Sequence, residues 1–278
     1  MPSDILHLSD GEQVRYEQRG QGPDVLLLHG TLVTLEDMMI GLGDTLAPHF
    51  RVTAVDRPGH GESTRKRFRG TLKDQTGAIR QAVEALGLQR PVVVGHSAGA
   101  SVAVSYGLDF PDDVTGVVSL SGVVYPELRL EHVLYGPRAL PVAGDALAFG
   151  PAPLMDSLLD PILWRAMFLP QAMPPAFKSS FPFALAGKPT DLQATGEEAN
   201  ATVTELLRNL ARYPLSPVPM TVMNGDRDVV VNPAHSRILA QLLRHSRHEQ
   251  LPGLGHMIHH FAQDRILAAI EELLARQH

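Results

Sequence analysis

The sequence predicts an α/β fold in which helices flank a mostly parallel sheet, and three observations support this prediction. Short runs of consecutive apolar residues, which are typical of strands buried on both faces, alternate along the chain with helical patterns. An alternating stretch near the N-terminus predicts an antiparallel edge hairpin. A region rich in proline and aromatic residues interrupts the rhythm once and predicts a helical insertion.

The predicted elements begin with two strands within residues 5–18, joined by a tight turn at Asp10-Gly11. Buried strands are then expected at residues 24–28, 52–55, 91–95, 114–120 and 219–223. Helical patterns occupy residues 74–86, 98–109, 233–243 and 262–275. A short strand is expected just before the last helix, ahead of a glycine-rich loop.

Residues 125–217 contain no clear strand pattern and hold most of the chain's 22 prolines. Short helices are expected there, such as residues 161–168 and 197–213, separated by turns that proline marks. We therefore predict a core domain of residues 1–124 and 218–278 and a helical cap of residues 125–217. The alternative is an ordinary helical layer of the main domain.

Composition excludes several classes of function. With 24 basic and 30 acidic residues the net charge is −6, which gives no general attraction to nucleic acid. The short basic run Arg65, Lys66, Arg67 and Arg69 is interpreted as a solvated loop. The chain has no cysteine, and neither a signal-peptide pattern nor a membrane-spanning run is evident. We expect a cytoplasmic protein without membrane insertion; its oligomeric state stays open.

The strongest local signal is Gly95-His96-Ser97-Ala98-Gly99, which lies between a predicted strand and a predicted helix. A serine on a strained strand-to-helix turn projects its oxygen as a nucleophile, and small neighbours let the turn form. The start of the helix places the Ala98 amide where negative charge develops on an attacked carbonyl oxygen. Ser97 is therefore the candidate nucleophile.

A serine nucleophile needs a base, and His256 in a glycine-rich loop is the candidate. His259 and His260 compete with it, and the three could share a helix face and bind a metal. We predict no metal site, and the alternative for His259 and His260 is a solvated helix start. Two acidic residues follow the strand at 219–223. Asp228 is the candidate partner of the base, whereas Asp226 is expected to order the turn.

The second donor to the oxyanion is expected after the strand at residues 24–28, where Gly30 permits a tight turn. The Thr31 amide is the first candidate and Leu32 the alternative. His29 and Arg57 are expected to support the neighbouring loops. His96 lies beside the nucleophile and is counted among the substrate-binding residues, although its side chain is expected to pack away from the chemistry.

Together these motifs resemble the α/β-hydrolase superfamily, in particular its serine esterase-like branch with a helical cap. The resemblance runs through His29-Gly30, the loop at residues 56–63, Gly95 to Gly99, Gly225-x-x-Asp228 and Gly255-His256. It implies a catalytic triad of Ser97, Asp228 and His256, with Thr31 and Ala98 in the oxyanion hole. Where many relatives have proline, this chain has Leu32.

These residues predict hydrolysis of a small to medium hydrophobic carboxylic ester through an acyl-enzyme, without a cofactor. Apolar residues of the predicted cap suggest a hydrophobic pocket, although core packing accounts equally well for them. The predicted substrate contacts are Leu32, His96, Trp164, Phe168, Phe181 and Phe183. The alternatives are a carbon-carbon bond hydrolase or perhydrolase with the same triad, and a non-catalytic receptor of the same fold.

Overall fold

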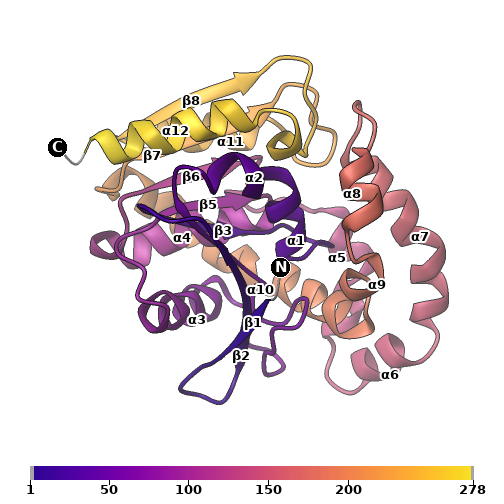
Figure 1. Ribbon diagram of the computed structural model, residues 1–278. Helices are drawn as coiled ribbons and strands as arrows, with labels where there is room; N and C mark the ends of the chain where they lie inside the picture. Colours follow the sequence, from indigo (N-terminus) through magenta and orange to yellow (C-terminus); the bar gives the residue numbers. More distant parts are fainter. Residues whose placement is uncertain (1–2, 277–278) are drawn as a thin grey trace.

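The computed structural model describes residues 3–276 and has an eight-stranded sheet at its centre (Figure 1). The strands are β1 (Asp4–His7), β2 (Gln13–Arg19), β3 (Asp24–Leu28), β4 (Arg51–Val55), β5 (Val92–His96), β6 (Gly116–Leu120), β7 (Met220–Gly225) and β8 (Ser246–Leu251). Their spatial order is β1-β2-β4-β3-β5-β6-β7-β8. β2 pairs antiparallel with β1 and β4, and the remaining neighbours pair in parallel. The predicted edge hairpin and mostly parallel sheet are confirmed.

Helices cover both faces of the sheet. On one face lie α3 (Leu72–Ala85), α4 (Ala98–Asp109) and α11 (Ala234–Leu242), whose apolar residues share a core with alternate strand residues. On the other face lie α1 (Leu35–Met38), the π-helix η1 (Met39–Gly43), α2 (Asp44–Leu46) and α12 (Gln263–Ala275).

The continuous apolar runs of the sequence follow from this two-sided burial. In β3, for example, Leu26 and Leu28 belong to one core, whereas Val25 and Leu27 belong to the other. Successive strand residues point to opposite faces, so a strand between two helical layers needs apolar residues at every position. All five residues of β3 are buried.

The chain between β6 and β7, residues 121–219, is called the helical segment. Its helices are α5 (Leu130–Leu134), η3 (Gly136–Ala139), α6 (Ala143–Phe149), α7 (Ala152–Met167), α8 (Pro175–Ser180), α9 (Phe183–Ala186), α10 (Pro189–Arg212) and η4 (Tyr213–Leu215). Figure 1 shows α6 to α9 gathered at one end of the sheet, and α10 contacts α3. Among residues 3–276 no helix is long and apolar enough to cross a bilayer.

Two helix boundaries within this segment were predicted wrongly. Pro161 was expected to begin a helix, but it lies inside α7, nine residues after the helix starts. Proline cannot donate a hydrogen bond to the carbonyl of Ser157, and the helix tolerates this because both residues are exposed to solvent. The helix predicted at residues 197–213 begins earlier, because Pro189 occupies the first turn of α10.

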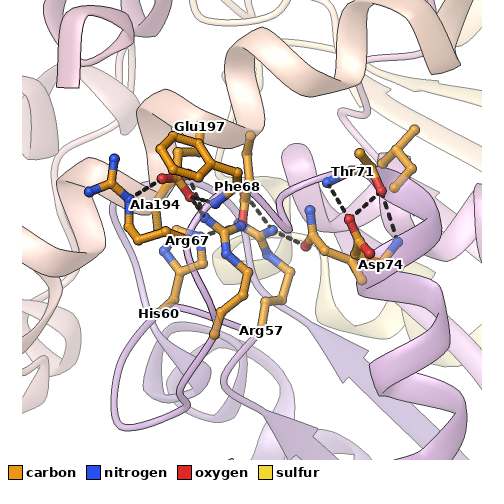
Figure 2. A network of polar contacts seen from close by, with 12 residues as sticks. Arg57, His60, Arg67, Phe68, Thr71, Asp74, Ala194 and Glu197 are labelled. Carbon is orange, nitrogen blue, oxygen red and sulfur yellow. Dashed lines mark hydrogen bonds and ion pairs between the residues drawn. The ribbon is translucent and has the colours of Figure 1, made fainter. Parts of the chain in front are cut away.

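The basic run at residues 65–69 is not a solvated loop throughout, which corrects the sequence interpretation. The Arg65 side chain is 3% exposed and donates to Glu197 Oε2 at 2.7 Å and to Glu198 Oε1 at 3.1 Å. Figure 2 shows Arg67 directed at Glu197, and the two form an ion pair. Acidic side chains of α10 pair with these arginines, a contact between residues about 130 positions apart that local sequence does not reveal.

Candidate active site

Ser97 occupies the turn between β5 and α4 with a backbone φ of +54°. This value is uncommon for a residue with a side chain and indicates a strained turn. Gly95 and Gly99, on either side of this turn, must both be glycine because backbone atoms lie very close to them. A Cβ on Gly95 would lie 2.3 Å from the carbonyl oxygen of Gly99, and one on Gly99 would lie 2.3 Å from that of Leu28. The turn therefore forms only with glycine at both positions.

His256 and Asp228 lie in two loops that follow the neighbouring strands β8 and β7. His256 Nδ1 is 2.8 Å from Asp228 Oδ2, and both side chains are buried. The amides of Val230 and Val231 each donate to Asp228 Oδ1 at 2.8 Å. Burial opposes the charge of Asp228, but His256 and these amides outweigh it and hold the pKa of the carboxyl below its ordinary value. The carboxylate therefore stays ionised and accepts a hydrogen bond from the Nδ1–H group of His256.

Asp226, the rival acid, faces elsewhere. Its Oδ1 accepts a hydrogen bond from the Gly253 amide at 2.6 Å and so connects the turn after β7 to the loop before His256. Only Asp228 of the two contacts the imidazole.

Ser97, Asp228 and His256 line one cavity of about 640 Å³, together with Thr31 and Leu32. Within residues 3–276, Ser97 Oγ makes no hydrogen bond to His256. Such bonds are often loose before substrate binds and tighten in the complex. The cavity gives both groups access to the same bound molecule.

The turn after β3 carries the candidate oxyanion donors. Leu32 has a φ of +61°, and its carbonyl accepts a hydrogen bond from Trp164 Nε1 at 2.8 Å. Within the described part of the chain, the amides of Thr31, Leu32 and Ala98 donate to no protein acceptor. These three amides therefore remain the candidates for an oxyanion hole, and the choice between Thr31 and Leu32 stays open.

The cavity wall is apolar but differs from the set predicted from the sequence. Of the six predicted substrate contacts, only Leu32 lines it. Val229, Val230 and Pro233 follow β7, and the helical segment supplies the other apolar lining residues, which are Leu128, Leu130, Leu134, Tyr135, Leu163, Ala166 and Met167. Charged side chains stand at the same wall, namely Glu127, Arg129 and Glu131. The lining residues of α7 lie next to Trp164 at helical spacing, but nothing in their sequence separates a cavity face from a buried face.

The predicted aromatic contacts pack against one another instead. Phe168, Phe181 and Trp164 belong to a buried cluster with Phe177, and Phe183 packs against its edge. The rings of Phe177 and Phe181 stack with centroids 4.4 Å apart. This cluster supports the turn at Leu32 through Trp164 and adjoins the cavity, because Leu32, Tyr135 and Met167 belong to both.

Two of the predicted supporting roles are visible in the hydrogen bonds. His29 Nδ1 lies 2.8 Å from the Gly30 carbonyl, and its Nε2 accepts from the Arg57 amide at 2.9 Å. The buried guanidinium of Arg57 donates to the His29 carbonyl at 2.9 Å and to Glu198 at 2.8 Å. These contacts join the turn after β3 to the loop after β4 and to α10.

His259 and His260 are buried, which contradicts their interpretation as a solvated helix start. Both contact Asp37, a residue that the sequence analysis missed because nothing local marks its carboxylate as buried. Asp37, His96 and His259 have ligating atoms within 4.8 Å of one another, so among residues 3–276 they form the group that could hold a metal ion. His256 is not part of it.

Comparison with known proteins places the chain in a family. Residues 23–263 match the family described as alpha/beta hydrolase fold. The chain is 36% identical over 115 residues to the dihydrolipoyllysine-residue acetyltransferase component of the acetoin cleaving system of Cupriavidus necator. That match covers 41% of this chain, and the chain spans only 30% of the relative's length.

Two solved structures share the fold across nearly the whole chain. The enol-lactonase of Burkholderia xenovorans LB400 has a TM-score of 0.76 at 22% identity, covering 98% of this chain and 100% of that one. The esterase EaEST of Exiguobacterium antarcticum has a TM-score of 0.77 at 20% identity, covering 99% of each. With the family match over residues 23–263, the chain belongs to the alpha/beta hydrolase fold family.

Proposed function

We propose that the protein hydrolyses a small to medium hydrophobic carboxylic ester through an acyl-enzyme formed on Ser97. The observation that carries the proposal is the 2.8 Å contact between His256 and Asp228 in the cavity that Ser97 also lines. A carboxylate on Nδ1 fixes the tautomer of the imidazole, which leaves Nε2 as the proton acceptor.

In the proposed reaction, Ser97 Oγ attacks the ester carbonyl as its proton passes to His256 Nε2. The Ala98 amide and that of Thr31 or Leu32 donate to the oxyanion. The tetrahedral intermediate then collapses, and the alcohol leaves with the proton from His256. A water molecule repeats the sequence on the acyl-enzyme and releases the acid.

The apolar wall supports a hydrophobic substrate, because an acyl or aryl group gains free energy when it leaves water for such a surface. Residues of both the core and the helical segment line the cavity. This supports a core domain of residues 1–124 and 218–278 that is covered by a helical cap of residues 125–217. An esterase and an enol-lactonase among the structural neighbours carry out the same class of bond cleavage.

The test is hydrolysis of a series of p-nitrophenyl esters by the wild-type protein and by Ser97→Ala. We expect the variant to fold normally and to lose activity by at least about 1,000-fold. A fluorophosphonate probe should label wild-type Ser97 and leave the variant unlabelled. Unchanged hydrolysis in the variant would refute the assignment, and a wild-type protein that resists the probe would favour a binding protein of this fold.

A further inference from the structure

A buried cluster of one carboxylate and three imidazoles lies behind the candidate active site. It consists of Asp37, His96, His259 and His260 and is called the Asp37 cluster. His259 Nε2 lies 3.0 Å from each carboxylate oxygen of Asp37, and His260 Nε2 lies 2.8 Å from Oδ1. Asp37 is fully buried, so it meets no water that could replace these contacts.

The hydrogen bonds fix the protonation of this cluster. Burial opposes the charge of Asp37, but contact with His259 and His260 outweighs it and holds the pKa of the carboxyl well below its ordinary value. An ionised carboxylate only accepts hydrogen bonds, so both histidines donate through Nε2–H. Burial also lowers the pKa of His259, and it holds the pKa of His96 well below its ordinary value, so the His96 imidazole is neutral.

His96 connects this arrangement to the candidate base. Its Nε2 donates to the backbone carbonyl of His256 at 3.1 Å. Its ring lies between two others, with centroids 4.6 Å from His256 and 4.4 Å from His259. Because His96 is neutral and donates through Nε2, its Nδ1 is a bare lone pair, which agrees with its lack of a partner among the described residues.

The cluster therefore joins the three chain segments that carry the candidate chemistry. Asp37 follows the turn with the oxyanion donors, His96 directly precedes Ser97, and His259 follows His256 by three residues. The packing around it leaves little space. A Cβ on Gly41, in the π-helix η1, would lie 2.8 Å from His259 Cδ2. Glycine at this position allows the helix and the imidazole to approach closely.

We propose that Asp37 is a positioning residue for His256. By accepting hydrogen bonds from His259 and His260, it holds the loop after β8 against the turn after β3 and keeps the imidazole of His256 in register with Ser97. The proposal rests on the proposed function in one respect, namely that His256 is the base. Both oxygens of Asp37 already accept N–H donors, so hydrogen bonding satisfies the site without an ion.

The test is Asp37→Asn, which keeps the shape of the side chain but replaces one acceptor with an N–H donor. His259 Nε2 lies 3.0 Å from both oxygens of Asp37, so in the variant it faces an N–H donor at one of them, and we expect the loop to shift. We expect kcat for a p-nitrophenyl ester to fall about 10- to 100-fold, with KM changed less than about twofold. A loss of this size is typical when a residue that orients a functional group, without itself contacting the substrate, is replaced. The downfield proton resonance of the His256–Asp228 hydrogen bond should also shift or broaden.

Asp24→Asn is the matched control. Asp24 is a buried carboxylate that binds Arg51 and begins β3, at the strand end opposite the candidate turn. This control should lower stability without changing kcat or the His256 resonance. Equal losses of kcat in the two variants would overturn the proposal, because they would report general destabilisation.

Gly41→Ala provides a second variant if Asp37→Asn fails to fold. Its Cβ displaces His259 while Asp37 stays in place, and the same loss of kcat and the same change in the resonance are expected. Unaltered kcat and resonance in a folded variant would contradict the positioning role. So would stoichiometric zinc in the purified wild-type protein, since the cluster would then be a metal centre. The resonance is measured without substrate, so it tests the proposal even if no ester is hydrolysed.

Discussion

His256 Nδ1 lies 2.8 Å from Asp228 Oδ2, although the two residues are 28 positions apart and belong to different loops. The other oxygen of Asp228 accepts hydrogen bonds from two backbone amides of the same loop. These bonds hold the carboxylate in place independently of its contact with the imidazole. This arrangement orients the imidazole and stabilises a positive charge on it. The activity should therefore be sensitive to a change of a single atom in this pair.

Replacing Asp228 with asparagine tests this pair. The variant keeps the shape of the side chain but offers His256 no charge and only one acceptor oxygen. We expect kcat for a p-nitrophenyl ester to fall roughly 10⁴-fold, with the fold preserved, because the imidazole loses its orientation and its charge stabilisation. Steady-state kinetics and a thermal melt measure the two effects.

Asp226→Asn is the control for that experiment. Asp226 holds the Gly253 amide and does not contact His256, so this variant should lose some stability and keep most of its kcat. A loss of kcat as large as that of Asp228→Asn would show that Asp226, the rival acid, serves the base.

The apolar cavity wall predicts how acyl-chain preference is altered. Met167 of α7 lines the cavity, and tryptophan at this position fills part of the space. We expect Met167→Trp to shift the optimum toward shorter p-nitrophenyl esters, seen as a fall in kcat/KM that grows with chain length. A preference that stays the same would place the acyl group elsewhere.

Phe181 provides the contrast, because it is buried in the aromatic cluster and does not line the cavity. Phe181→Leu should lower the free energy of unfolding by roughly 1–3 kcal/mol through lost packing, with chain-length preference unchanged. A shift in preference would mean that the aromatic cluster contacts substrate, as the sequence analysis first predicted.

The sequence predicts the sheet well because local patterns encode it. The strand at residues 24–28 has the predicted bounds, since two-sided burial requires an uninterrupted apolar run. The turn at Ser97 is equally local, because the glycines at 95 and 99 are required by contacts within the turn and with the end of β3. The placement of Asp228 opposite His256 follows from the parallel register of β7 and β8.

Contacts between distant segments could not be predicted in this way. Phe181 and Met167 are apolar residues of one buried cluster in the helical segment, and only tertiary packing brings Met167 to the cavity as well. His260 was expected in solvent because its neighbours gave no sign that Asp37, 223 positions away, would bind it. Arg65 was assigned to a solvated loop for the same reason.

Asp191 should make stability depend on pH near neutrality. Burial raises the pKa of Asp191 to about 7, despite the Gly61 amide at 2.7 Å and the nearby, partly exposed Lys188. A carboxyl whose pKa is raised on folding stabilises the folded state at low pH, and this contribution is lost as pH rises through about 7. Thermal melts should therefore show that Asp191 contributes a fall in wild-type Tm between about pH 4 and pH 7, which is absent in Asp191→Asn. Equal slopes in the two proteins would contradict this prediction.

Glu198 should show the opposite dependence on pH. Burial disfavours its charge, but Arg57, His60 and Arg65 outweigh burial and lower the pKa of the carboxyl. A lowered pKa gives stability that is present above the pKa of about 4.3 of an unfolded glutamate and is lost as pH falls below it.

Glu198→Gln leaves two buried arginines without this carboxylate and should cost roughly 3–5 kcal/mol of unfolding free energy at pH 7. The difference from wild type should shrink as pH falls toward the lowered pKa, because the wild-type carboxyl then gains a proton as well. Urea unfolding at several pH values measures this convergence. Asp112→Asn, at an exposed position, should show no such trend, and a constant difference for Glu198→Gln would mean that packing rather than charge holds α10 to the loop after β4.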